Sequence, residues 1–318
     1  MGIPVLSFAN NKGGVAKTTC LSLMGEYGCL IKKKRVLMID FDSQMNLSIH
    51  WIGCDTDDIG SNIALAHPEI DENNEEDMQY YSKRSNISDI FYGKGVLPHP
   101  TYLGKDNAND DEPRVDIISS CYKSMYDLQV DMMSRVKKDM STKDAKHLIS
   151  RLAEFCSSKE LENYYDLILI DTSPFDSPLF RAVIKACTKI VIPYKPEEFS
   201  LTGITTLINN IYIDNSHRGK DRENIDLIGI LPTIVDKGRT GLHTGIIKEA
   251  SKLKNHFPEN LFISNSQKIS SRQSRCGVSP NSVFDLKPSD PVRKECFAVF
   301  EYIYNRTFNI DANEGAAA

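Results

Sequence analysis

The sequence predicts an α/β fold, in which a mostly parallel, twisted sheet carries helices on both faces. Short runs rich in β-branched and other apolar residues alternate along the chain with longer stretches of helical character. Polar residues rarely interrupt these runs, which is typical of strands buried on both faces. The chain has 318 residues, of which 41% are hydrophobic and 25% charged, as in ordinary globular proteins and unlike disordered ones.

The elements follow in chain order from this alternation. The predicted strands are Pro4–Ala9, Arg35–Asp40, Val115–Ser119, Leu167–Asp171, Lys189–Pro193, Ile225–Leu231 and Leu261–Ser264. The predicted helices are Thr18–Lys33, Ser124–Arg135, Thr142–Cys156, Leu201–Tyr212, Leu242–His256 and Pro291–Asn305. Together they predict one domain over residues 1–310, with acidic surface insertions at about 55–80 and 99–114 and a flexible tail at 311–318.

Charge is spread unevenly along a chain whose formal net charge is −5. Residues 54–116 contain 15 acidic and 5 basic side chains, whereas residues 217–275 contain 11 basic and 6 acidic ones. The acidic total argues against a protein covered with nucleic acid but allows one local basic face. Scattered cysteines without a C-x-x-C pair, no run near the roughly 20 apolar residues of a membrane span, and no basic leader region favour a cytoplasmic location.

The loop between the first predicted strand and the first predicted helix carries the strongest signal. Its sequence is Ala9-Asn10-Asn11-Lys12-Gly13-Gly14-Val15-Ala16-Lys17-Thr18-Thr19. The plain phosphate-binding loop is G-x-x-x-x-G-K-[ST], and Asn11 and Ala16 stand at its two glycine positions. The two remaining glycines still let backbone N–H groups turn toward phosphate oxygens, next to the positive end of the following helix. The loop therefore predicts a nucleotide phosphate site.

With its second lysine, Lys12, this loop resembles the deviant Walker A motif of the ParA/MinD family of P-loop ATPases. Further segments resemble that family in the expected order. Ile39–Leu47 is similar to its switch segment, with Ser43 where proline is usual, and Tyr165–Pro174 is similar to its Walker B strand, with Ser173 as a departure. Pro193–Ser200 and Gly229–Thr233 are similar to later family segments. The resemblance is closest to the ParA-type DNA partition ATPases.

The cofactors implied are ATP and Mg²⁺, because phosphoryl transfer needs neutralised phosphate oxygens, a metal ion and a positioned water. Lys17 stands where a P-loop lysine reaches the β- and γ-phosphates, and the Thr18 hydroxyl stands where Mg²⁺ binds. Asp171, at a strand end, is predicted to hold the water shell of the metal. Asp40 is predicted in the outer metal shell, with the capping of nearby amides as the alternative. The resemblance implies that Asp42 orients or deprotonates the attacking water.

The predicted site residues share the first loop and two strand ends. Those that bind the nucleotide are Lys12, Gly13, Gly14, Val15, Ala16, Lys17, Thr18 and Thr19; those at the metal are Thr18, Asp40 and Asp171; those that serve catalysis are Lys12, Lys17 and Asp42.

The resemblance gives Lys12 a role of its own. In this family the corresponding lysine reaches across a nucleotide-sandwich dimer to the phosphates of the partner. ATP then favours the homodimer because its phosphates gain charged contacts from both subunits, and hydrolysis loosens it.

ParA-type relatives use the ATP dimer to bind DNA without sequence preference, and a centromere-binding, ParB-like partner stimulates hydrolysis. The resemblance therefore implies a weak, Mg-dependent ATPase that partitions plasmid or chromosomal DNA at the nucleoid. The basic stretch supplies candidates for the DNA contact, although a solvated surface explains each of them singly. These candidates are Lys248, Lys252, Arg272 and Arg275.

Other uses of the same switch stay open. MinD-type relatives bind membrane through a basic amphipathic C-terminal helix, but Phe297, Phe300 and Tyr304 predict a helix docked on the core, so no membrane insertion is expected. The switch is alternatively used to position a protein cargo or to regulate a membrane-associated apparatus. A third alternative is a nucleotide-binding module whose hydrolysis is impaired by Ala16, Ser43 and Ser173.

Overall fold

A seven-stranded sheet forms the centre of the computed structural model, which describes residues 2–104, 109, 111–138, 143–174, 177–197, 200–219, 223–236, 240–273 and 281–310. Its strands are ordered β5-β6-β2-β7-β1-β8-β9. Every neighbouring pair is parallel except β5 with β6. The strands are β1 (Val5–Phe8), β2 (Arg35–Phe41), β5 (His99–Pro100), β6 (Arg114–Ile118), β7 (Leu167–Thr172), β8 (Lys189–Tyr194) and β9 (Asp226–Pro232). The predicted fold class is therefore confirmed.

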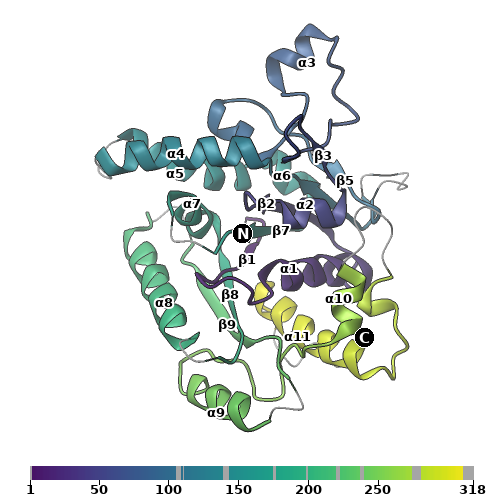
Figure 1. Cartoon of the computed structure of the whole chain (residues 1–318), viewed down its shortest axis with the longest axis vertical. Helices are drawn as coiled ribbons and strands as arrows, with labels where there is room; N and C mark the ends of the chain where they lie inside the picture. The colour runs from purple at the N-terminus through teal and green to yellow at the C-terminus, as the bar shows by residue number, and fades with distance from the viewer. Residues whose placement is uncertain are drawn as a thin grey trace.

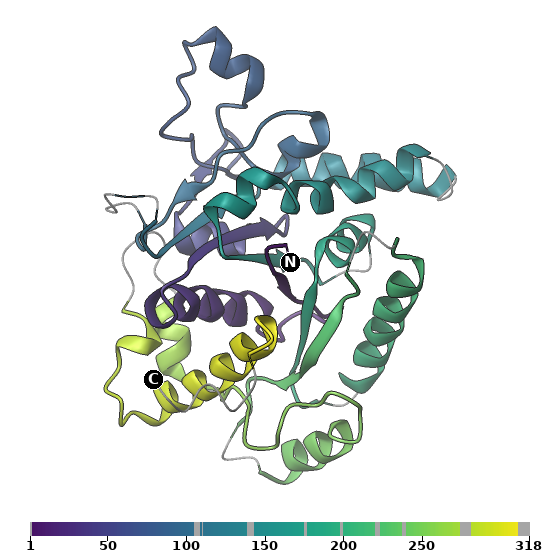
Figure 2. The same cartoon turned by 180° about the vertical axis from the view of Figure 1, so that it is seen from behind.

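Helices cover both faces of this sheet (Figures 1 and 2). One face packs against α4 (Tyr122–Lys138), α5 (Lys143–Cys156), α7 (Pro178–Ala186) and α8 (Ser200–His217). The other packs against α1 (Lys17–Glu26), α2 (Asn46–Trp51), α10 (Gln267–Gln273) and α11 (Pro291–Thr307). The remaining elements are β3 (Asp55–Thr56), β4 (Asn62–Ile63), α3 (Glu75–Tyr80), α6 (Lys159–Tyr164), α9 (Thr240–Ala250), a π-helical turn η1 (Tyr27–Ile31) and two 3-10 turns, η2 (Ile87–Tyr92) and η3 (Val283–Asp285).

The central strands read as unbroken apolar runs because both of their faces are buried. In β7 the side chains of Ile168 and Ile170 belong to the core on one face, and those of Leu167 and Leu169 belong to the core on the other. All four are fully buried. A strand between two helical layers needs apolar residues at every position, which is why the sequence shows no alternation here.

Six of the seven predicted strands are present, and Leu261–Ser264 is not a strand. This segment runs beside the loop that follows β9, where Ile263 donates its N–H to the carbonyl of Pro232 at 3.0 Å. Only Ser264 forms an isolated bridge, to Val235. Because Pro232 has no N–H to donate and β9 ends there, no regular ladder extends to this segment.

The two predicted insertions differ in structure. The first contains the small antiparallel pair β3–β4 and α3, which project above the sheet in Figure 1. The second begins with β5, whose residues His99 and Pro100 pair with β6 and extend the main sheet by one short edge strand. The extent of the single domain stays a prediction, and the predicted tail at 311–318 lies outside the described residues.

Helix α11 is docked on the core. Phe300 is fully buried, Tyr304 is almost so, and Phe297 packs partly buried against the same cluster around Tyr27. Within the described part of the chain, no helix is long and apolar enough to cross a membrane.

The buried His99 makes the stability of the edge strand depend on pH. Burial and the neighbouring His67 lower the pKa of His99 from 6.5 to about 4, so the folded state resists a proton that the unfolded chain accepts. The stability held above pH 6.5 is thus lost as pH falls toward 4, on the order of 2 kcal/mol by pH 5. Urea unfolding at pH 7 and pH 5 should show a smaller loss for His99→Gln than for the native chain. Equal losses would contradict this assignment.

Candidate phosphate and metal site

The loop after β1 wraps around a cavity of about 480 Å³ at the carboxyl edge of the sheet. Gly14 and Ala16 both adopt left-handed backbone conformations, with φ of 69° and 62°. Ala16 directly precedes α1 and thus holds the conformation for which the plain P-loop uses glycine. The cavity is lined by Gly13, Gly14, Val15, Ala16, Lys17, Thr18, Thr19, Asp42, Gln44, Asn46, His50, Thr172 and Pro174.

Two side chains that the sequence did not single out fix this loop to the sheet. The buried Asn10 donates from Nδ2 to the carbonyl of Pro193 at 2.7 Å, and its Oδ1 accepts from the N–H of Lys12 at 3.0 Å. The buried Thr233 donates from Oγ1 to the carbonyl of Val15 at 3.0 Å. The strand ends of β8 and β9 therefore hold the loop in place before any ligand binds.

Lys17 lies inside the loop and is 7% exposed. Its Nζ donates to the carbonyl of Lys12 at 3.2 Å. Burial lowers the pKa of Lys17, while the nearby carboxylates of Asp171 and Asp42 raise it. An ammonium group in this position has little water around it and is available to phosphate oxygens.

The end of β7 brings a carboxylate to the start of α1. Thr18 donates its hydroxyl to Oδ2 of Asp171 at 2.6 Å. The other oxygen, Oδ1, is buried and has no hydrogen-bond partner among the described residues. An orphaned buried oxygen beside a hydroxyl suits a hard cation, so these residues fit Mg²⁺. Among the described residues, no group of three or more Asp, Glu, His or Cys side chains is placed to hold a metal ion by itself.

Asp40 stands beside Asp171 because β2 and β7 pair these two residues in register. Both are fully buried. Burial and mutual repulsion raise the pKa of Asp171 to about 8, and burial raises that of Asp40 to about 6. Asp40 also accepts hydrogen bonds from the N–H of Asp42 and from the N–H and hydroxyl of Ser48, at 3.1, 2.8 and 2.7 Å. Its observed contacts are thus those of the capping alternative, and its place in the outer metal shell stays a prediction.

Asp42 lies on the turn between β2 and α2 and lines the cavity. Its Oδ1 accepts the N–H of Gln44 at 3.0 Å, which fixes the carboxylate toward the loop. Burial raises the pKa of Asp42, and the ammonium of Lys17 opposes this rise. The structure therefore brings Asp42, Lys17, Thr18 and Asp171 into one site.

Lys12 points away from this group. Its Nζ forms an ion pair with Oε2 of Glu197 at 2.9 Å, and Oε1 of the same carboxylate binds Lys195 at 2.5 Å. The two lysines lower the pKa of Glu197 to about 2. Lys12 remains 39% exposed. The sequence could not indicate this anchor, because 185 residues separate the two partners.

The predicted DNA residues do not share one helix. Lys248 is exposed on α9, but α9 ends at Ala250, and Lys252 lies in the following turns, where it pairs with Glu249 at 2.5 Å. The predicted helix Leu242–His256 would place Lys248 and Lys252, four residues apart, on one face. Because α9 ends at Ala250, that prediction is wrong. The chain turns here through i to i+3 hydrogen bonds and a left-handed Asn255, with φ of 67°. Arg275 and the side chain of Arg272 lie outside the described residues.

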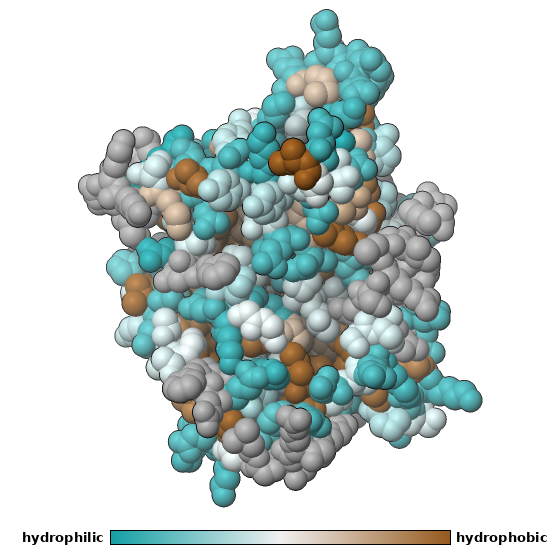
Figure 3. Space-filling model, viewed as in Figure 1, coloured by the Kyte–Doolittle hydropathy of each residue, from teal (hydrophilic) through white to brown (hydrophobic). Residues whose placement is uncertain are grey.

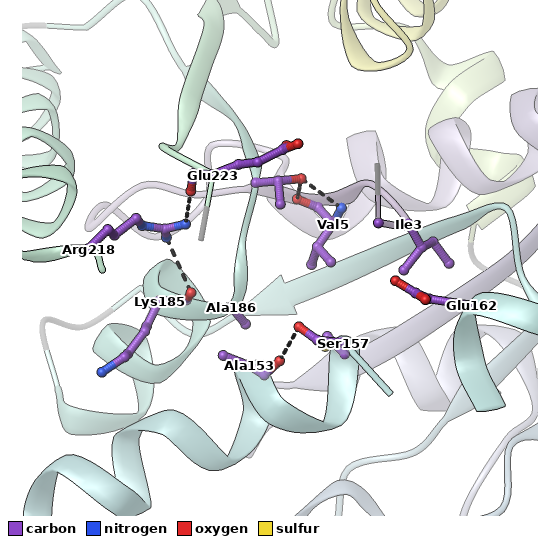
Figure 4. A pocket seen from close by; sticks show the side chains of 12 residues that line it. Ile3, Val5, Ala153, Ser157, Glu162, Lys185, Ala186, Arg218 and Glu223 are labelled. Carbon is purple, nitrogen blue, oxygen red and sulfur yellow. Dashed lines mark hydrogen bonds between the residues drawn. The ribbon is translucent and has the colours of Figure 1, made fainter. Parts of the chain in front are cut away.

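A second cavity, of about 300 Å³, lies at the opposite edge of the sheet (Figure 4). The guanidinium of Arg218 donates there to the carbonyls of Glu223, Ile184, Lys185 and Cys187 and to the carboxylate of Asp214. These bonds join α7, α8 and the start of β9, so the charge of Arg218 serves the fold. The carboxyl-edge cavity is the better candidate for chemistry.

The chain is similar to known proteins over most of its length. A family model described as AAA domain matches residues 3–223. The chain is 28% identical to a ParA family protein of Mycoplasma genitalium over 84% of this chain and 85% of that protein. It is 23% identical to the sporulation initiation inhibitor protein Soj of Bacillus subtilis over 78% of this chain and 79% of that protein.

Solved structures share the fold. An ATP complex of McdA from Cyanothece superposes with a TM-score of 0.62 at 17% identity, covering 98% of both chains. The pNOB8 ParA bound to nonspecific DNA gives a TM-score of 0.60 at 20% identity, covering 97% of this chain and all of that one, 100%. Cobyrinic acid a,c-diamide synthase from Mycobacterium smegmatis with bound ADP and magnesium gives 0.58 at 18% identity, covering 83% of this chain and 87% of that one.

The left-handed Ala16 predicts an unusual response to glycine. Ala16→Gly should raise the free energy of unfolding by about 0.5–1 kcal/mol, because relief of the left-handed strain exceeds the added entropy of the unfolded chain. Ala298→Gly, on the exposed face of α11, is the matched control and should lower it by about 1 kcal/mol. Urea titration compares the two. If Ala16→Gly lowered the free energy of unfolding as much as the control does, the left-handed backbone of Ala16 would not be strained.

Proposed function

Because this chain belongs to the AAA domain family and is a P-loop ATPase of the ParA/MinD type, we propose that it is an ATP-dependent dimeric switch that partitions DNA. In this proposal the ATP-bound homodimer binds DNA without sequence preference. A ParB-like partner stimulates weak, Mg-dependent hydrolysis, which releases the DNA. The protein then acts in the cytoplasm, in association with the nucleoid. The observation that carries the proposal is a phosphate site whose first lysine, Lys12, points away from its own site.

The nucleotide would lie in the carboxyl-edge cavity. Backbone N–H groups of residues 13–19 and the ammonium of Lys17 would neutralise its phosphates. Thr18 and Asp171 would hold Mg²⁺, which supplies charge neutralisation when bound. The orphaned Oδ1 of Asp171 supports this assignment. The ADP and magnesium in the M. smegmatis synthase, which has the same fold, lend further support.

Asp42 is proposed to position the attacking water. Asp42 lines the same cavity as the loop, and its carboxylate accepts the N–H of Gln44. Lys17 stands close enough to influence its charge. A carboxylate beside the phosphates orients water, and its raised pKa favours taking up a proton as the water attacks.

Lys12 is proposed to leave Glu197 and to bind the phosphates of a partner subunit. The ion pair with Glu197 is exposed and therefore weak, whereas the contact of an ammonium with a triphosphate carries several negative charges. Lys195 stays on the other oxygen of Glu197, so that carboxylate keeps a counter-charge after Lys12 departs.

DNA binding is proposed for the basic C-terminal stretch. Lys248 is exposed, and Lys252 is 67% exposed at its side chain. The pNOB8 ParA, which has the same fold, was solved on nonspecific DNA, and this supports the proposal. The DNA contact is proposed for four candidates: Lys248, Lys252, Arg272 and Arg275. The salt dependence of DNA binding measures whether each of them contacts a phosphate.

If Lys12 reaches the nucleotide of the partner subunit, its removal should abolish dimerisation but not nucleotide binding. Lys12→Ala should bind a non-hydrolysable ATP analogue as a monomer but fail to dimerise with it. Glu197→Gln should release Lys12 and lower the dimer dissociation constant by up to about fivefold, the value of an exposed ion pair. Light scattering with the analogue measures both. Lys195→Ala is the control: it leaves Glu197 paired with Lys12 alone and should not lower the dimer dissociation constant. A Lys12→Ala protein that dimerises like the native chain would refute the crossing role.

The DNA proposal predicts the slope of binding against salt. Each phosphate contact contributes about −0.9 to the slope of log K against log salt. The double variant Lys248→Ala, Lys252→Ala should therefore flatten the slope by about 2, measured with the non-hydrolysable analogue on random-sequence duplex DNA. Lys83→Ala, in the acidic stretch 54–116, should leave the slope unchanged. A slope near zero in the native protein would instead favour a protein cargo.

A further inference from the structure

A side chain from the end of another strand holds the carbonyl of Val15, in the loop after β1. Thr233 directly follows the last residue of β9, and its hydroxyl lies 3.0 Å from this carbonyl. Thr233 is fully buried, so it adds nothing to the largely hydrophilic surface seen in Figure 3. Its hydroxyl therefore acts only inside the protein, on the loop and on the strand end beside it.

The Thr233 hydroxyl has two acceptors within reach but only one proton to donate. The carbonyl of Tyr194, at the end of β8, also lies 3.0 Å from it. That carbonyl already accepts the N–H of Thr233 at 2.8 Å. Because buried carbonyls need a donor, donation of the hydroxyl to Val15 gives each carbonyl one hydrogen bond. The N–H and the hydroxyl of one residue thus tie the loop to β8.

Backbone contacts on both sides fix the position of Thr233. Before it, β9 pairs with β8 as far as Pro232. After it, Val235 donates its N–H to the carbonyl of Ile263 at 3.0 Å. Between these two contacts Ile234 has a left-handed backbone, with φ of 53°, which is unfavourable for a β-branched residue. Such a conformation persists only where the surrounding contacts hold it, which indicates that Thr233 is rigidly placed.

The Val15–Ala16 peptide carries the effect of this contact to the cavity. The peptide is trans, so it is planar and its C=O and N–H groups point in opposite directions. Val15 and Ala16 are among the described residues that line the cavity and Thr233 is not, so Thr233 lies on the other side of the loop. The hydrogen bond that draws the Val15 carbonyl toward Thr233 therefore turns the N–H of Ala16 toward the cavity.

We propose that Thr233 is a positioning residue of the phosphate site, whose hydroxyl orients the N–H of Ala16 toward a phosphate oxygen of the bound nucleotide. The left-handed backbones of Gly14 and Ala16 suit a loop whose N–H groups converge on an anion. In this role Thr233 contacts neither phosphate nor metal and acts through the loop alone. The inference deepens the proposed function and rests on its nucleotide site.

The test compares Thr233→Val, which keeps the shape of the side chain but removes its hydroxyl, with Thr233→Ser, which keeps the hydroxyl. Isothermal titration calorimetry measures the dissociation constants of ADP and of inorganic pyrophosphate, each with Mg²⁺. Thr233→Val should raise both by about tenfold, the lower end of what a hydrogen bond to a charged group contributes, and Thr233→Ser should restore them. The matched control is Thr307→Val on α11. Thr307 is also buried and donates its hydroxyl to the carbonyl of Ile303 at 2.8 Å, and its variant should leave both constants unchanged.

Pyrophosphate separates a role in the loop from a contact with the base, because it carries phosphate oxygens but no adenine. A weaker affinity for ADP with an unchanged affinity for pyrophosphate would mean that Thr233 acts on the base, and would overturn the inference. Equal binding by the native chain and Thr233→Val, or a failure of Thr233→Ser to restore binding, would overturn it as well. A native chain that binds neither ligand would overturn the proposed nucleotide site itself, and the inference with it.

A second measurement needs no variant and therefore decides the matter even if Thr233→Val does not fold, which circular dichroism reveals. Hydrogen exchange of the Ala16 amide is followed by NMR in the native chain, with and without magnesium pyrophosphate. Exchange should slow by about tenfold or more, because a hydrogen-bonded amide exchanges only when its bond opens. An unchanged exchange rate would contradict the orientation of this N–H toward phosphate.

Discussion

Three buried carboxylates and one buried ammonium share the carboxyl edge of the sheet, and the rest of the site depends on this concentration of charge. The carboxylates of Asp171 and Asp42 lie near enough to Lys17 to raise its pKa, Asp40 pairs in register with Asp171, and all four side chains are buried. Burial of charge without full compensation is unfavourable, as the raised pKa values of Asp40 and Asp171 indicate. A bound magnesium nucleotide would place a cation beside these carboxylates and phosphate oxygens beside Lys17. Its binding would therefore compensate the buried charges that the fold leaves without full partners.

The first lysine of the loop obeys a different constraint. The Lys12 side chain is 39% exposed and forms an ion pair with Glu197, whose carboxylate also binds Lys195. Because this ion pair is exposed, it stabilises the nucleotide-free chain only slightly and costs little free energy to break. The contrast between a buried Lys17 and a loosely held Lys12 supports the switch between one copy and two that we propose.

Much of this was predictable from local sequence. The strands β1, β2, β6, β7, β8 and β9 were found because burial on both faces forces unbroken apolar runs. The loop residues were singled out because phosphate binding demands glycines, lysine and a hydroxyl in order. Residues 13–19 line the carboxyl-edge cavity, and their contact with phosphate stays a proposal. The contacts between distant segments were not predictable: Asn10 with Pro193, Thr233 with Val15 and Lys12 with Glu197 depend on which strands become neighbours. The sequence wrongly predicts a strand at Leu261–Ser264 because this segment has the apolar composition of a strand. Its neighbour β9 ends at Pro232, so no regular ladder of hydrogen bonds forms between them.

The most direct test is a crystal structure of the chain with Mg²⁺ and a non-hydrolysable ATP analogue. The account predicts two copies face to face, with Nζ of Lys12 hydrogen-bonded to a phosphate of the opposite nucleotide and Glu197 left with Lys195. A solitary copy that binds the nucleotide while Lys12 remains on Glu197 would contradict it.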